Sequence, residues 1–110
     1  MVATLPENFM IIYNVTVKVS LQRAEEWVLW MKEEHIPELM ATGLFSESRL
    51  SRLLEQDETE GITFSAQYFC QNLDDYRAYI EQFAPLMREK GLKRFGDQMI
   101  AFRSVMEEIG

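Results

Sequence analysis

Apolar and polar side chains alternate most regularly between Phe9 and Val19. Tyr13 is followed by a valine at every second position, whereas the positions between are held by Asn14, Thr16 and Lys18. Most of the apolar residues are β-branched or aromatic, which favours an extended backbone whose successive side chains point to opposite faces. The pattern therefore predicts a β-strand with one apolar row and one polar row.

After Ser20 the spacing of the apolar residues becomes helical. Ser20 is a suitable N-cap, and Glu25 and Glu26 suit the positive end of a helix dipole. We expect Pro37 to kink this helix or to end its first part, and Gly43 to end the remainder. At about 100° per residue, one face of this helix gathers the side chains of Ala24, Trp27, Val28, Met31, His35 and Leu39.

The middle of the chain has the pattern of a β-hairpin. Residues that favour strands run from Phe45 to Leu54 and again from Ile62 to Cys70. Between them lies the acidic segment from Gln56 to Gly61, which we predict to be the turn.

A second helix follows, with Asn72 as its cap, an interruption at Pro85 and an end near Gly91 or Gly96. Its apolar stripe consists of Tyr76, Tyr79, Ile80, Phe83 and Met87. Residues 99–106 then predict a final strand, so the element order is βαββαβ. This order predicts a ferredoxin-like α+β fold, a four-stranded antiparallel sheet with two helices on one face.

The helices can cover one face of this sheet, which leaves the other face to water or to a partner. The side chains expected there are mixed, and they include Asn14, Thr16, Thr63, Ser65 and Gln67, with Ala101 and Arg103 from the last strand. Parity places Phe45 and Phe69 on the same face, and exposed aromatic residues favour a covering partner. We therefore predict a homodimer whose two sheets pack face to face as a dimeric α/β barrel.

Length and charge narrow the classes of function. The 110 residues suffice for one domain, which we assign to residues 10–110. Residues 1–9 show no periodicity and are expected to be an extension, with Met10 as a candidate for the natural start. The formal net charge of −7 would repel a phosphate backbone, so we expect no nucleic-acid partner.

The sequence also lacks the patterns of several other classes. No apolar run approaches the ~18 residues of a membrane span, and the amino-terminal residues do not form a secretion signal, so we expect a cytoplasmic protein without a membrane partner. Cys70 is the only cysteine and His35 the only histidine, which argues against an intrachain disulfide and a zinc site. No phosphate-binding loop or known catalytic motif is present. We therefore expect neither a metal nor a cofactor.

His35 is the candidate catalytic residue, because it is the only side chain whose ordinary pKa lies near neutrality. Its position on the wheel turns it towards the sheet beside Trp27 and Met31, where it could act as a general base or orient a ligand. The alternative is a buried histidine that is hydrogen-bonded to a neighbouring carbonyl or tyrosine and has a structural role.

The candidate ligand-binding set adds strand residues to this helical face. The full set is Trp27, Met31, His35, Tyr13, Asn14, Gln67 and Tyr68. Tyrosines at strand and helix spacing are also typical of a core. Asn14 and Gln67 lie in mid-strand, where an amide needs a partner, and a dimer interface is the first choice for it, before a ligand.

Short motifs spread along the chain resemble an uncharacterised family of small bacterial proteins, classed as a domain of unknown function. The resemblance covers Met10 to Ile109. It is carried by the segments Ile12–Thr16, Trp27 with Trp30–Met31, Glu34–Pro37, Ala41–Gly43, Gln67–Phe69, Phe83–Pro85 and Ala101–Arg103. The resemblance implies a fold but no activity.

More distantly, the element order resembles the dimeric α/β-barrel superfamily, which includes cofactor-independent monooxygenases, lactone isomerases, haem-degrading enzymes and effector-binding modules. This resemblance implies a cleft between sheet and helices, bordered here by Trp27, Met31 and His35. Haem degradation is the weaker analogy, because the second helix contains no histidine. The leading hypothesis is a homodimer that binds a small apolar or aromatic molecule, with catalysis left open. The alternative is a structural or protein-interaction dimer without a ligand pocket.

Overall fold

A computed structural model describes residues 10–110, and the expected extension at residues 1–9 lies outside that range. The elements follow the predicted order, although each long helix is divided. They are β1 (Ile11–Ser20), α1 (Ala24–Trp30), η1 (Met31–His35), α2 (Ile36–Ala41), β2 (Glu47–Arg52), β3 (Gly61–Cys70), α3 (Leu73–Gln82), α4 (Ala84–Phe95), η2 (Gly96–Gln98) and β4 (Met99–Glu107).

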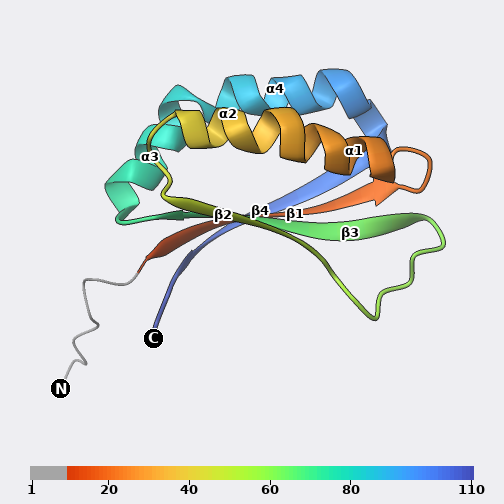
Figure 1. Cartoon of the computed structure of the whole chain (residues 1–110), viewed down its shortest axis with the longest axis horizontal. Helices are drawn as coiled ribbons and strands as arrows, with labels where there is room; N and C mark the ends of the chain where they lie inside the picture. The colour runs from red at the N-terminus through yellow and green to blue at the C-terminus, as the bar shows by residue number, and fades with distance from the viewer. Residues whose placement is uncertain (1–9) are drawn as a thin grey trace.

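The four strands form one antiparallel sheet in the order β2-β3-β1-β4. All helical segments lie on the same side of this sheet, and α1 and α2 run beside α4 (Figure 1). This arrangement confirms the predicted ferredoxin-like α+β fold. It creates a layer between helices and sheet, which we call the helix side, and leaves the opposite face of the sheet, the open side.

The first helix does not end at Pro37. Instead, the five residues of η1 form a π-helical turn, in which the Ile36 N–H donates to the carbonyl of Met31. Proline lacks an N–H and its ring crowds the carbonyl four residues before it, so a widened turn here lets the helix continue into α2. The helix ends where expected, at Gly43, whose φ of 77° is the left-handed conformation that glycine tolerates.

The two predicted N-caps have different outcomes. Asn72 caps α3, because its side chain accepts a hydrogen bond of 2.9 Å from the Asp75 N–H. Ser20 does not cap α1, which begins four residues later at Ala24. Ser20 ends β1, and its hydroxyl donates to Gln98 Oε1, so the capping prediction was wrong because β1 extends further than its pattern suggested.

Strand pairing decides which residues occupy each side of the sheet. Directly paired residues share a face, so the pairs Val17–Ala101 and Val15–Arg103 place both β4 residues on the helix side. The prediction that Ala101 and Arg103 lie on the open side was therefore wrong. Sequence parity alone does not fix the phase of a strand relative to its neighbours.

Phe45 was also expected on the open side, and it belongs to the buried core instead. It lies before β2 begins, where the alternation of a strand does not apply, and its ring packs 5.1 Å from that of Tyr79. Phe69 does lie on the open side, paired with Ile12, and the guanidinium of Arg49 covers its ring at 5.1 Å.

Candidate functional site

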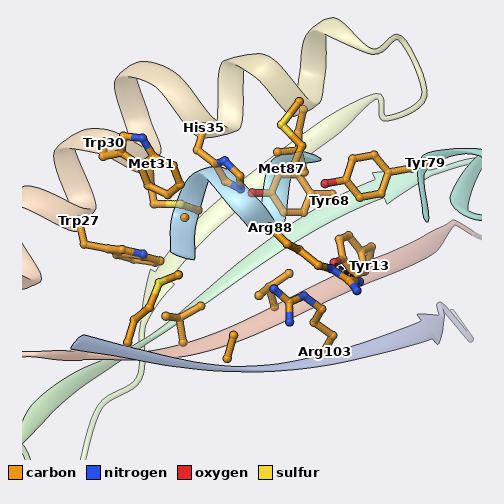
Figure 2. Close-up of a pocket in the computed structure, with 16 residues that line it drawn as sticks. Tyr13, Trp27, Trp30, Met31, His35, Tyr68, Tyr79, Met87, Arg88 and Arg103 are labelled. Carbon is orange, nitrogen blue, oxygen red and sulfur yellow. Dashed lines mark hydrogen bonds between the residues drawn. The ribbon is translucent and has the colours of Figure 1, made fainter. Parts of the chain in front are cut away.

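A cavity of about 60 Å³ lies between the helices and the sheet, lined from β1, β3 and β4 below and from the helices above. Its volume would hold about four water molecules. Of the predicted ligand-binding set, five residues line it, namely Tyr13, Trp27, Met31, His35 and Tyr68. Figure 2 shows the aromatic rings, the histidine and two arginines around this space.

His35 enters the cavity from the π-helical turn. Its imidazole stacks on the Trp30 indole, with ring centroids 4.4 Å apart and planes inclined by 20°. Residues five apart in an α-helix would point about 140° apart. The wider π-helical turn aligns them, so the backbone irregularity produces the stacked pair.

The Nδ1 atom of His35 is buried and has no hydrogen-bond partner within the described part of the chain. Burial lowers the pKa of His35 from 6.5 to about 4, and the positive charges of Lys90 and Arg103 add to this effect, while Glu38 opposes it. The imidazole is therefore neutral at pH 7. A neutral imidazole offers one donor and one acceptor to a ligand.

Three tyrosines form the aromatic wall on the other side of the cavity. The ring centroids of Tyr13 lie 6.0 Å from those of Tyr68 and 5.6 Å from those of Tyr79. Burial raises the pKa of both Tyr68 and Tyr79, so their hydroxyls stay protonated and can donate hydrogen bonds.

Two arginines complete the lining. Arg88 reaches from α4, and its Nη2 donates to the Tyr13 hydroxyl over 3.4 Å, while its Nε is buried without a partner among the described residues. Arg103 comes from β4, where it is exposed, and it lies on the sheet side of the cavity below Arg88 (Figure 2). Within residues 10–110, neither arginine forms a salt bridge.

Asn14 and Gln67 are not part of this site. They pair with each other in the sheet on the open side, so neither lines the cavity. The Asn14 amide makes three hydrogen bonds inside the protomer, to Thr16 (3.1 Å), Ser65 (2.8 Å) and Ser104 (3.5 Å). The structure therefore does not bring them together with the other five predicted residues, because residues of even and odd number on one strand face opposite sides.

The cavity lining also includes Trp30, Arg88 and Arg103, which were not predicted from the sequence as site residues. On a regular helical wheel Trp30 points away from His35, and the π-helical turn brings it into the site. Arg103 was assigned to the open side. The partial burial of Arg88 and the register of β4 are properties of the assembled fold, and no local pattern reveals them.

The fold and the cavity now allow a comparison with known proteins. A model of a domain of unknown function, DUF4286, matches residues 10–109. The chain belongs to the DUF4286 family. This confirms the resemblance to an uncharacterised family, over the range that the motifs indicated. A comparison with curated protein sequences finds no match to this DUF4286 chain.

Several solved structures are similar to this DUF4286 chain, and they come from bacteria and from an uncultured marine organism. A dimeric ferredoxin-like protein from an uncultured marine organism has a TM-score of 0.64 at 13% identity, over 93% of this chain and 97% of its own. A protein named "Putative antibiotic biosynthesis monooxygenase" from Bordetella bronchiseptica has a TM-score of 0.65 at 16% identity, over 91% and 95%. An ethyl tert-butyl ether d (ethd) family protein from Bacillus halodurans has a TM-score of 0.61 at 10% identity, over 89% and 98%.

The TM-scores support the ferredoxin-like fold of the DUF4286 chain, and the low identities leave its activity open. No helix in residues 10–110 is both long and apolar enough to cross a membrane. The same residues contain no group of three or more histidine, cysteine, aspartate or glutamate side chains placed to hold a metal ion. The cavity lining offers one imidazole, three phenols, two indoles and two guanidinium groups among apolar side chains.

Proposed function

We propose that the protein is a homodimer that binds a small apolar or aromatic molecule in the cavity of each protomer. The observation that carries this proposal is the Nδ1 atom of His35, which has no partner among the described residues and is buried beside a cavity walled by aromatic rings. A buried polar atom without a partner costs about 1–3 kcal/mol, and folded cores rarely retain one. A ligand group at this point would remove that cost.

Hydrogen bonding is the first role of His35 in this proposal, and catalysis the second. With its pKa lowered to about 4, the imidazole is a weak base at pH 7. It would accept a hydrogen bond from a ligand hydroxyl, or donate one, without taking a proton. A catalytic role as general base requires a bound ligand that raises this pKa.

The homodimer is supported by the open side of the sheet. Three apolar side chains of β4 project from that side and remain exposed, Ile100, Phe102 and Met106, with 73% of the Phe102 surface in contact with solvent. Exposed apolar side chains gathered on one face of a sheet favour a covering partner. The marine ferredoxin-like protein of the same fold is described as dimeric, which supports a second copy of this chain as that partner.

Ligand binding is tested with benzyl alcohol, a neutral ring compound that carries one hydroxyl, and with benzoate. Each compound is titrated into isotope-labelled protein while the resonances of the His35, Trp27 and Trp30 rings are followed by NMR. We expect saturable shifts confined to the cavity and weaker binding to His35→Phe, which keeps an aromatic ring on Trp30 and removes the nitrogen atoms. An absence of saturable shifts with either compound would refute the binding function.

The dimer is tested by size-exclusion chromatography with light scattering at micromolar concentration. We expect twice the chain mass of 13.0 kDa. Phe102→Glu places a charge within the apolar row of β4 and is expected to give the mass of a monomer. Leu54→Glu is the matched control, because Leu54 is 77% exposed outside the sheet. A wild-type mass of 13.0 kDa would contradict the proposed assembly, and the alternative dimer without a ligand would leave the NMR titration flat.

A further inference from the structure

We propose that the ligand is a small monocarboxylic acid whose carboxylate binds between Arg88 and Arg103, while its apolar or aromatic body enters the cavity. The inference rests on the cavity function proposed above, and it adds the charge of the ligand. It follows from two cationic side chains that converge on an aromatic cavity with no carboxylate in its lining.

The two arginines differ from most other cations of the described chain in lacking a counter-ion. Arg23, Arg49, Arg52, Lys90, Lys93 and Arg94 each lie within 4.0 Å of a glutamate oxygen. Arg88 and Arg103 have no such contact within residues 10–110, although both line the same cavity. Two like charges at one cavity repel each other, and an anion bound between them would lower this repulsion.

The hydrogen-bonding capacity of Arg88 is also largely unused. Among residues 10–110, its Nε is buried without a partner, and its one side-chain hydrogen bond is the 3.4 Å contact with the Tyr13 hydroxyl. An arginine presents several N–H donors in a planar fork that matches the two oxygens of a carboxylate. Arg103 supplies a second fork from the opposite wall of the cavity.

Selectivity for an anion is unexpected from the overall charge. The chain carries 18 acidic residues against 11 basic ones, so its general surface repels anions. A local pair of cations at an apolar cavity therefore acts against the surrounding field. This contrast favours a ligand with one negative charge and a body that gains from burial among Tyr13, Met31 and Tyr68.

The hydrophobicity of the cavity lining favours a carboxylic acid over a simple inorganic anion. The walls away from the arginines are formed mainly by apolar and aromatic side chains, and they offer few donors to the oxygens of a phosphate. The apolar lining matches the chemistry of a ring or short aliphatic chain, and the arginines match that of a single carboxylate. We therefore assign benzoate as the probe that combines both properties.

The experiment compares four compounds by isothermal titration at pH 7 on the full chain. Benzoate has the ring and the charge, benzamide the ring alone, acetate the charge with little body, and inorganic phosphate the charge with a different geometry. We expect benzoate to bind at least about tenfold more tightly than benzamide, because hydrogen bonds to charged groups are worth that much. Acetate and phosphate are expected to bind more weakly than benzoate.

Three arginine variants test the location. Arg103→Gln is expected to weaken benzoate binding about tenfold or more and to leave benzamide binding unchanged, and Arg88→Lys should reduce benzoate binding while keeping a positive charge. Arg77→Gln is the matched control, because Arg77 is exposed on α3 and its replacement changes the net charge equally. We expect its affinity for benzoate to stay within about twofold of wild type, because exposed charges act weakly at a distance. Melting temperatures confirm that each variant folds.

The outcomes separate this inference from the proposed function. Equal binding of benzoate and benzamide, or benzoate binding that Arg103→Gln does not change, overturns the anion site and leaves the cavity function intact. Phosphate binding as tight as that of benzoate overturns the assignment to a carboxylic acid. If no ring compound binds, the proposed function fails as well.

Discussion

The two sides of the sheet use similar residues for different purposes. On the helix side, aromatic rings from strands and helices surround a cavity in which His35 Nδ1 and Arg88 Nε have no hydrogen-bond partner from residues 10–110. On the open side, Asn14 is satisfied by its neighbours Thr16, Ser65 and Ser104, whereas apolar side chains of β4 remain exposed. The helix side therefore leaves polar groups unsatisfied, and the open side leaves apolar groups uncovered.

This contrast indicates what each side needs. An unsatisfied polar atom in an apolar cavity calls for a small molecule with a matching donor or acceptor. An uncovered apolar row on a sheet calls for another surface of similar size. The helix side thus lacks hydrogen-bond partners, and the open side lacks cover for its apolar side chains. Mutations on the two sides should therefore have different effects on stability and binding.

The largest expected difference concerns stability. Trp27→Ala removes a ring that is 1% exposed and stacked 4.9 Å from Phe64, so the free energy of unfolding should fall by about 3–5 kcal/mol. Phe102→Ala on the open side should alter the intrinsic stability of a protomer by less than about 0.5 kcal/mol. Urea denaturation at several protein concentrations separates the intrinsic stability of the protomer from the contribution of dimer dissociation, because only the latter depends on protein concentration. A similar loss for both variants at low concentration would contradict the contrast.

A second prediction concerns the pH dependence on the helix side. The pKa of His35 is about 4 in the folded chain and 6.5 when unfolded, so between these values only the unfolded chain binds the proton. The neutral His35 ring therefore contributes fully to the free energy of unfolding above pH 6.5. This contribution is lost as the pH falls through 4. It amounts to at most about 3 kcal/mol.

The measurement is urea denaturation between pH 4 and 7.5 for the wild type and for His35→Phe. The carboxylates of the chain titrate in both proteins, so their difference isolates His35. We expect the wild type to lose more stability than the variant on acidification. Parallel curves, with an NMR titration of His35 near pH 6.5, would mean that the ring is solvated and that the site is open to water.

The smallest expected effect is at the polar cluster of the open side. Asn14→Ala removes the acceptor of the Ser65 hydroxyl and two further hydrogen bonds, and should cost about 1 kcal/mol. Thr63→Ala is a suitable control on the same side, since the structure gives Thr63 no side-chain hydrogen bond. Thermal denaturation monitored by circular dichroism compares the two. An equal change in both variants would show that the cluster adds nothing beyond the strand itself.

The element order and most of the helix-side core were predictable, because alternation in β1 and helical spacing around Trp27 are local patterns. The Asn72 cap and the Gly43 terminus were predictable for the same reason. Arg103 was placed on the wrong side, because its direction depends on the pairing of β4 with β1. The stacking of Trp30 on His35 depends on a π-helical turn, which a wheel of fixed angle cannot represent.

The candidate site was therefore predicted as a region more accurately than as a set of residues. His35, Trp27 and Met31 come from one helical face, and local spacing is sufficient to group them. Arg88 and Arg103 come from segments that meet only in the assembled layer, and a charged residue in a sequence is more often on the surface. Long-range register is the information that the sequence pattern lacked.

The π-helical turn has a consequence for how this chain can change in length. A π-helical turn holds one residue more than an α-helical path would need, so a deletion among the exposed residues Lys32 and Glu33 would restore a regular helix and keep the later residues in phase. That regular helix would place Pro37 within an α-helical ladder, at a cost of about 3 kcal/mol or more. Relatives that lack one residue in this helix should therefore also lack the proline, and the deletion should be tolerated here only together with Pro37→Ala.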